Sequence, residues 1–269
     1  MNLLQDLIRS KLTGSGGALP ALTDPALPSD VASGKEYING SGAKQTGTLV
    51  AYSADDWLDE TKPVGVVTSD KKFASNSPGV YFDGRTGITG LHLTETLYVP
   101  PKICYKCQNL EIITAPNAIK IFENAFEGCS KIQKNIVFPK VKSMKGYVFT
   151  GTEIVAADFG GTPGTGEGLE GYQAFQRNDD FDVLVLRGAA VWKLGNINNF
   201  VSTKFESGKA GGTLYVPASL ISSYQAATNW AIILGYPNNQ IKSIESTATD
   251  PDAPVDLTTH YIDGTLITA

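Results

Sequence analysis

A motif that recurs about every 23 residues constrains the fold of this chain more than any other feature of its sequence. Phe126, in an Ala-Phe-x-Gly-Cys-x-x-Ile segment, recurs as Phe149, and Pro116 recurs as Pro139, each 23 residues later. A unit this short cannot bury its own apolar face, so consecutive units have to stack on one another. We therefore expect each unit to contribute one short strand and a turn, and the strands to form a parallel sheet along one side of the stack.

Stacking places equivalent residues of successive units in continuous interior rows. The predicted repeat core consists of Cys107, Leu110, Phe126, Cys129, Ile132, Phe149 and Ile154. In this alignment Cys107, Cys129 and Thr152 fill the same tight interior position. A further, degenerate unit is possible between Ala174 and Leu186.

The segment 213–246 is expected to close the end of the stack, because a stack of repeats needs a capping unit to stay soluble. The sequence predicts a strand that ends at Pro217, then a helix from Ala218 to Asn229. On this helix Leu220, Ile221 and Tyr224 face inward, and Trp230 covers the last repeat. The predicted cap residues are Tyr215, Pro217, Tyr224 and Trp230.

Residues 97–246 resemble the leucine-rich repeats of bacterial surface proteins of the BspA-like, or treponemal, type. The Ala-Phe-x-x-Cys-x-x-Leu pattern of that family is matched by Asn124 to Ile132, and its terminal unit by Gly212 to Leu220. The phrase Thr-Leu-Tyr-Val-Pro at 96–100 opens the array. The resemblance implies a mainly β fold with short helices, built as a short leucine-rich-repeat solenoid that presents a binding surface. Only two or three repeats are clear, and residues 160–171 form a Gly-rich insertion.

A second resemblance lies upstream of the repeats. Two short strands around the Asn39-Gly40 turn belong to a unit, 27–49, that resembles a module frequent in bacteriophage tail and fibre proteins. The resemblance implies a virion component, made in the host cytoplasm and located in the virion.

An amphipathic helix is predicted at residues 1–12, before a Gly-rich linker at 13–17. Its apolar face consists of Leu3, Leu4, Leu7, Ile8 and Leu12. Because a helix of this length is marginal alone, the face has to dock on the rest of the chain, a symmetry copy or a larger assembly.

These features divide the chain into five segments. They are an anchor helix and linker at 1–17, an extended segment and β-hairpin module at 18–49, a small β region at 50–96, the repeats with their cap at 97–246, and a linker with a terminal strand or hairpin at 247–269.

Composition and charge exclude several classes of protein. A hydrophobic fraction of 42% is enough for a buried core, and 22 Lys and Arg against 27 Asp and Glu disfavour a general nucleic-acid binder. No apolar stretch is long enough for a transmembrane helix, and the first residues lack a signal-peptide pattern, so we expect the chain to stay in the cell that makes it and not to insert into a membrane.

The histidines and cysteines offer little catalytic or metal chemistry. Cys104-x-x-Cys107, with Cys129 and His92, could supply zinc or redox chemistry, but a second ligand pair is missing. We interpret the cysteines as core residues and expect no metal, no cofactor and no catalytic residues. A carboxylate pair for glycoside cleavage, with Asp179, Asp180 and Asp182 as nearest candidates, stays an alternative to acids that merely flank a strand.

Lysines exceed acids locally, eight to five, in residues 97–159. The surface-binding candidates are Lys131, Lys134, Lys140, Lys142 and Lys145. Such a face could attract an anionic cell-wall polymer or an acidic partner subunit, and the alternative is an ordinary solvated surface.

We therefore expect a non-enzymatic structural component of a bacteriophage virion, such as a tail fibre, baseplate or adhesin-like protein. It would dock on other virion proteins through its N-terminus and display the repeats to a host-surface polymer or protein. A homo-oligomer, with a trimer favoured, fits a fibre protein. The alternatives are a capsid decoration or head-fibre protein and a depolymerase of surface polysaccharide.

Overall fold

The computed structural model describes residues 65–77, 79 and 81–244, together with the backbone of four short strands outside this range. Residues 1–49 and 50–269 form two separate compact units. In the first unit, β1 (Glu36–Ile38) and β2 (Lys44–Thr46) pair antiparallel. In the second, β16 (His260–Ile262) and β17 (Thr265–Ile267) do the same.

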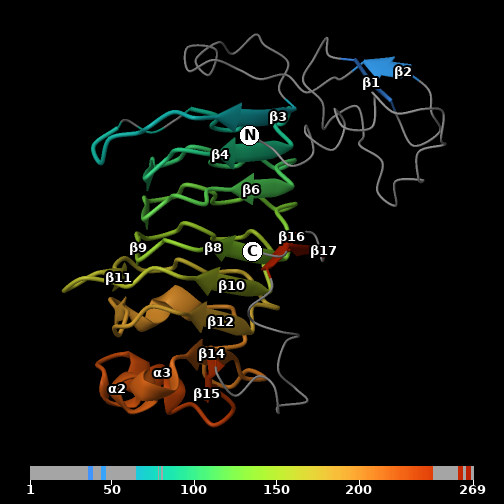
Figure 1. Cartoon of the computed structure of the whole chain (residues 1–269). Helices are drawn as coiled ribbons and strands as arrows, with labels where there is room; N and C mark the ends of the chain where they lie inside the picture. Colours follow the sequence, from blue (N-terminus) through green and yellow to red (C-terminus); the bar gives the residue numbers. More distant parts are fainter. Residues whose placement is uncertain are drawn as a thin grey trace, which may run out of the picture. The chain divides into compact units, whose positions relative to one another are not determined.

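Parallel strands dominate the second unit and follow one another in chain order (Figure 1). The first three form one sheet: β3 (Val66–Ser69), β4 (Gly90–Leu93) and β6 (Ile112–Thr114). Five more form the next: β8 (Asn135–Phe138), β10 (Ala156–Phe159), β12 (Val183–Leu186), β14 (Thr213–Val216) and β15 (Gln240–Ser243). Among the described residues, the first strand of this parallel stack is β3, which lies in the segment 50–96 that we expected to be a small β region separate from the repeats.

The same part of the chain also forms another five-stranded parallel sheet, which we call the second sheet. It consists of β5 (Tyr98–Val99), β7 (Lys120–Ile121), β9 (Ser143–Met144), β11 (Gly168–Leu169) and β13 (Lys193–Leu194). The expectation of one strand in each unit was therefore wrong. These strands are only two residues long, and a strand of two residues has no alternating pattern that sequence reasoning can detect.

The protein is mainly β with few and short helices, as predicted. In the part of the chain that the structure describes, the helices are η3 (Ile197–Phe200), η4 (Ala218–Leu220), α2 (Ile221–Ala226) and α3 (Trp230–Leu234).

A row of stacked phenylalanines forms the centre of the core. The ring centroids of Phe126 and Phe149 lie 5.6 Å apart, those of Phe149 and Phe175 6.2 Å, and those of Phe175 and Phe200 5.8 Å, with the rings nearly parallel. All seven predicted repeat-core residues are buried. The row continues beyond Phe149 to Phe175 and Phe200, so aromatic packing ties four consecutive units together.

Backbone hydrogen bonds connect each unit to the next at the turns. The amide of Phe126 donates to the carbonyl of Val148 (3.0 Å), and that of Gly128 to Thr150 (2.8 Å). Gly128 has a φ of +75°, a conformation that glycine adopts without the steric cost of a side chain. The Gly in the repeat motif is therefore a turn residue that orients the amides toward the next unit.

The C-terminal end of the second sheet is covered by side chains of α2 and α3, which lie at the lower end of the stack in Figure 1. Trp192 N donates to the Tyr224 hydroxyl (3.0 Å), and Trp230 Nε1 donates to the Trp192 carbonyl (2.6 Å). Asn229 Nδ2 donates to the carbonyl of Leu194 on the edge strand β13 (2.7 Å). Burial raises the pKa of Tyr224 to about 12, so this hydroxyl stays protonated.

One detail of the predicted cap differs in the structure. The expected helix 218–229 is interrupted, because the backbone is extended at Ala227 and Asn229 has a φ of +67°, so that a second helix starts at Trp230. Tyr215 lies on β14 in register with Val185 and packs beside it, in a cluster separate from the main core. Pro217 precedes η4, and Leu220 and Ile221 are half-buried against the main core.

Replacing Phe149 by Ala tests whether the phenylalanine row holds the stack together. The change removes stacking on both neighbours and leaves a cavity, so we expect the free energy of unfolding to fall by about 3–5 kcal/mol. Denaturant unfolding followed by circular dichroism measures this loss. Ile232→Ala is the control, because Ile232 is 48% exposed on α3, and it should change stability by less than about 0.5 kcal/mol. Equal losses in the two variants would contradict the assigned core.

Candidate binding surface

The outer face of the second sheet gathers charged and polar side chains from three consecutive units. Ile121, Met144 and Leu169 point into the core, so the residues before and after each of them point outward. The strand register places Lys120 beside Ser143. It also pairs Met144 with Leu169, and the residues that directly follow these two, Lys145 and Glu170, continue the same outer face.

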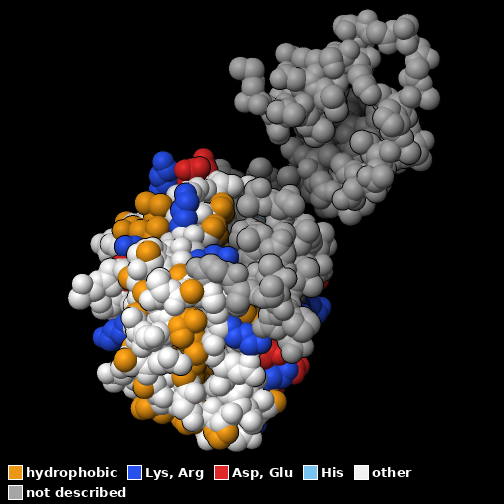
Figure 2. Space-filling model, turned by 60° about the horizontal axis from the view of Figure 1, so that its bottom comes forward, with side chains coloured by type: hydrophobic (Ala, Val, Ile, Leu, Met, Phe, Trp, Pro, Cys, Tyr) orange, Lys and Arg blue, Asp and Glu red, His pale blue; other side chains and the backbone are white. Residues whose placement is uncertain are grey.

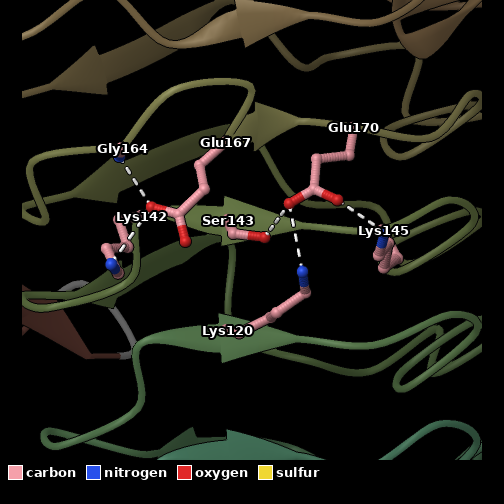
Figure 3. Close-up of polar contacts among 7 residues, drawn as sticks. All are labelled: Lys120, Lys142, Ser143, Lys145, Gly164, Glu167 and Glu170. Atoms are coloured by element: carbon pink, nitrogen blue, oxygen red, sulfur yellow. Dashed lines mark hydrogen bonds and ion pairs between the residues drawn. The ribbon is translucent and has the colours of Figure 1, made fainter. Parts of the chain in front are cut away.

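Glu170 is the centre of this network, as Figure 3 shows. Its Oε1 accepts hydrogen bonds from Lys120 Nζ (3.1 Å) and from the Ser143 hydroxyl. Its Oε2 accepts one from Lys145 Nζ at 2.5 Å. The carboxylate thus joins β7, β9 and the end of β11, three units that are 23 to 27 residues apart in the sequence.

Glu167 makes a second, neighbouring set of contacts. Its Oε2 accepts a 2.6 Å hydrogen bond from the amide of Gly164 and lies 3.1 Å from Lys142 Nζ (Figure 3). Glu167 closes the Gly-rich loop 160–167 onto the sheet, which gives this predicted insertion a defined conformation. We call Lys120, Lys142, Ser143, Lys145, Glu167 and Glu170 the Lys-Glu network.

Both carboxylates of the Lys-Glu network are held in the ionised form. The Gly164 amide, with Lys142, lowers the pKa of Glu167. Burial opposes ionisation of Glu170, but the hydrogen bonds from Lys145, Ser143 and Lys120 outweigh it and lower its pKa as well. A catalytic acid needs a raised pKa, so neither group is suited to protonate a leaving group. The side chains of Glu170 and Lys120 are 17% and 22% exposed, so a ligand can reach them while their mutual contact holds them in place.

Aromatic rings flank the Lys-Glu network. Tyr98 and Phe122 lie 6.5 Å apart between ring centroids, and Lys120 Nζ lies 5.6 Å from the Phe122 ring. Beyond Lys145, Tyr147 and Tyr172 meet edge to face at 5.2 Å, and Tyr172 is 51% exposed. The surface therefore combines fixed charges with apolar ring faces that a ligand can contact.

The five lysines that were predicted to form one binding face lie at separate sites on the surface. Of the five candidates, only Lys142 and Lys145 lie in the Lys-Glu network. Lys131 Nζ donates to Asn109 (2.9 Å), Lys140 Nζ donates to Asn117 (2.7 Å), and Lys134 pairs with Glu153 at 3.2 Å. Figure 2 likewise shows Lys and Arg side chains dispersed over the face it presents.

Lys131 and Lys134 line an open hollow of about 440 Å³. The other lining residues are Glu111, Ser130, Ile132 and Glu153. Both partners of the Lys134–Glu153 pair are more than 60% exposed, so solvent screens this pair more than it does the contacts of Glu170.

Sequence reasoning missed Lys120, Ser143, Glu167 and Glu170. Lys120 and Ser143 are 23 residues apart, so the repeat period alone assigns them to equivalent positions in consecutive units. Which face of the stack they occupy depends on the two-residue strands, and the sequence did not reveal those.

The three cysteines are free and buried. Cys107 Sγ donates to the carbonyl of Phe82 (2.8 Å), and Cys129 Sγ donates to that of Cys104 (2.9 Å). Burial raises the pKa of Cys104 and Cys129, which disfavours the reactive thiolate. Thr152 Oγ1 also donates to a backbone carbonyl, but to that of Phe149 within its own turn (2.9 Å), whereas the two thiols donate to the preceding unit.

The other candidates for chemistry have structural partners. Asp182 and Asp180 lie 3.1 Å and 3.8 Å from Lys204 Nζ, and Asp182 directly precedes β12. His92 on β4 hydrogen-bonds Thr114 Oγ1 through Nδ1 (2.8 Å), and burial lowers its pKa. Among the residues that the structure describes, no group of three or more His, Cys, Asp or Glu side chains is arranged to hold a metal ion.

The predicted docking residues Leu3, Leu4, Leu7, Ile8 and Leu12 lie outside the described residues. In the part of the chain that is described, no helix has the length and apolar character to cross a membrane.

Comparison of the chain with models of known families, with curated proteins and with solved structures gives no match.

The buried thiols predict a chemical behaviour that separates core cysteines from reactive ones. We expect a thiol reagent such as dithionitrobenzoate to leave the native protein unmodified and to react with all three cysteines in denaturant, because the native thiols are buried and protonated. Absorbance of the released thiolate measures both reactions. Rapid reaction of one cysteine in native buffer would instead indicate an accessible, activated thiol.

The Lys-Glu network predicts a pH-dependent contribution to stability. The folded-state pKa of Glu170 is below its ordinary value of 4.5, so its contribution is present above that pH and is lost as the pH falls through the folded-state pKa. We expect Glu170→Gln to lower the free energy of unfolding by roughly 1–2 kcal/mol at pH 7 and by much less near pH 3. Denaturant unfolding at both values measures this difference.

The control for that experiment is Glu153→Gln, because the Glu153–Lys134 pair is largely exposed. It should change stability by less than about 0.5 kcal/mol at either pH. If Glu170→Gln behaved like this control, the network would contribute nothing to folding.

Proposed function

We propose that the chain is a non-enzymatic structural component of a bacteriophage virion, of the tail-fibre, baseplate or adhesin-like kind. Residues 97–246 act in this proposal as a short leucine-rich-repeat solenoid that presents a surface for contact with the host or another protein. The N-terminal residues dock on other virion proteins, and the chain assembles as a homo-oligomer, with a trimer favoured.

The observation that carries this proposal is the combination of an interior filled by apolar side chains with an ordered polar outer face. The phenylalanine row and the inward residues of both five-stranded sheets occupy the inside of the stack. The Lys-Glu network is preorganised on the outside by hydrogen bonds between units. A stack of this kind extends a contact area with each added unit, which suits recognition of a large partner.

The repeat pattern supports the leucine-rich-repeat assignment. Equivalent residues 22 to 26 apart, such as Phe126, Phe149 and Phe175, lie on one another in the core. Strands in both five-stranded sheets are parallel and pair with the equivalent strand of the next unit. The phage assignment rests on the resemblance of residues 27–49 to a module of phage tail and fibre proteins.

A depolymerase of surface polysaccharide is the second candidate, and the carboxylates of the described surface do not favour it. Glu167 and Glu170 are ion-paired and have lowered pKa values, and Asp182 pairs with Lys204. Incubation of the purified chain with host cell walls separates the two functions: an adhesin is retained on the walls, whereas a depolymerase releases soluble sugar.

Immunogold labelling of phage particles from cells that encode this chain tests the proposal. We expect antibodies raised against residues 65–244 to label the particles, and the position of the label distinguishes tail from capsid. A chain that lacks residues 1–17 should stay in the lysate and leave the particles unlabelled, because it lacks the docking face. Particles without label, from lysates that contain the full-length chain, would refute a virion function.

A further inference from the structure

The outer face of the second sheet carries more cations than the Lys-Glu network alone contains. Lys193 on β13 pairs in register with Gly168, and Gly168 follows Ser143 and Lys120 in the same outward row. Lys193 is exposed, and none of the ion pairs between described residues includes it. The surface thus has four lysines, Lys120, Lys142, Lys145 and Lys193, against the two carboxylates Glu167 and Glu170.

The hydrogen-bond inventory of this surface leaves a surplus of donors. Each lysine ammonium has three N–H donors, and each of the three lysines in the Lys-Glu network uses one of them on a carboxylate. The remaining donors, with all three of Lys193, are available to an acceptor. Because donors and positive charge are both in excess, an anionic ligand fits this surface better than a neutral one.

The spacing of the cations follows the stack. Lys120 and Lys193 lie on β7 and β13, which are separated by β9 and β11, so their Cα atoms are roughly 14 Å apart at the usual distance between strands. Lys142 and Lys145 flank β9 between them. Cations distributed along this distance match a linear ligand with repeated negative charges that crosses the strands.

The aromatic rings favour a sugar polymer over an acidic protein. The C–H faces of sugar rings pack on aromatic rings, and Phe122 and Tyr172 provide such rings on both flanks of the lysines. Tyr172 is 51% exposed, so part of its ring is open to a ligand two residues after Glu170.

We propose that the outer face formed by β7, β9, β11 and β13 binds an anionic polysaccharide, with Lys120, Lys142, Lys145 and Lys193 pairing with its acidic groups and Phe122 and Tyr172 contacting its sugar rings. This inference names a ligand class for the display surface and rests on the proposed function only for its biological setting. The acidic group, carboxylate or sulfate, is the shared anionic chemistry that the lysines recognise.

Binding to defined polymers tests this site with the full-length chain. Polygalacturonate supplies carboxylates, dextran sulfate supplies sulfates, unmodified dextran is the neutral probe, and poly-L-glutamate is an acidic polymer without sugar. We expect one or both anionic polysaccharides to bind more tightly than dextran and poly-L-glutamate in biolayer interferometry, and the binding to weaken as salt is added.

Matched double variants locate the binding. Lys142→Gln with Lys193→Gln removes two charges from the site, and Lys131→Gln with Lys140→Gln removes two charges elsewhere. The first pair should raise the Kd for the bound polysaccharide about fivefold, and the second by less than about twofold. Tyr172→Ala leaves the charge unchanged and should also weaken polysaccharide binding. Circular dichroism confirms that each variant is folded.

Three results would overturn the inference. Equal losses in the two double variants would mean that binding follows net charge alone. Tight binding of poly-L-glutamate, unaffected by Tyr172→Ala, would point to an acidic protein partner instead. Binding of none of the polymers would remove the ligand class.

Failure of this inference and failure of the proposed function give different results. Labelled particles that carry Lys142→Gln with Lys193→Gln and still adsorb normally to host cells would refute the polysaccharide site and leave the virion assignment in place. Site-specific polysaccharide binding by a chain that never enters particles would refute the virion assignment and leave the polysaccharide site in place.

Discussion

Contact between consecutive units is the constraint on which the rest of this structure depends. A unit of about 23 residues with strands of two to four residues has no interior of its own, so its core side chains are buried against the units before and after it. Phe149 illustrates this: its ring lies between those of Phe126 and Phe175. Backbone amides at the turns, such as that of Gly128, add hydrogen bonds in the same direction. Stability therefore accumulates along the stack, and the last unit has to be covered.

The contacts that cover the last unit and the candidate binding surface both lie on the second sheet. The former are at its edge strand β13, and the latter is on its outer face. Strand β13 would expose backbone carbonyls at its edge, and Asn229 and Trp230 bond to carbonyls at and beside that strand. On the outer face of the same sheet, Glu170 connects three units through Lys120, Ser143 and Lys145. The network is thus part of the packing between units and, at the same time, a set of charges that is held in position. Such preorganisation reduces the entropy lost when a ligand binds.

Several predictions from the sequence concern residues whose neighbours in the stack follow directly from the repeat period. Phe126 over Phe149, and Cys129 and Thr152 as small buried residues, depend only on a spacing of 22 or 23 residues. The interrupted helix at Ala227 could not be foreseen in the same way, because Asn229 adopts a positive φ where its side chain can reach the carbonyl of Leu194. That geometry depends on a strand 35 residues away.

The sequence by itself determined the repeat period, the identity of the interior rows and the mainly β character of the chain, because hydrophobic periodicity and turn glycines are local signals. Only the tertiary structure decided that the units from β4 to β13 contribute two strands each and that Lys120, Lys145 and Glu170 meet on one outer face, while Lys131 and Lys140 lie elsewhere. The reason is physical: a shift of one residue in a strand moves a side chain to the opposite face. The register that fixes the face arises from pairing with neighbouring units, and no single unit contains that information.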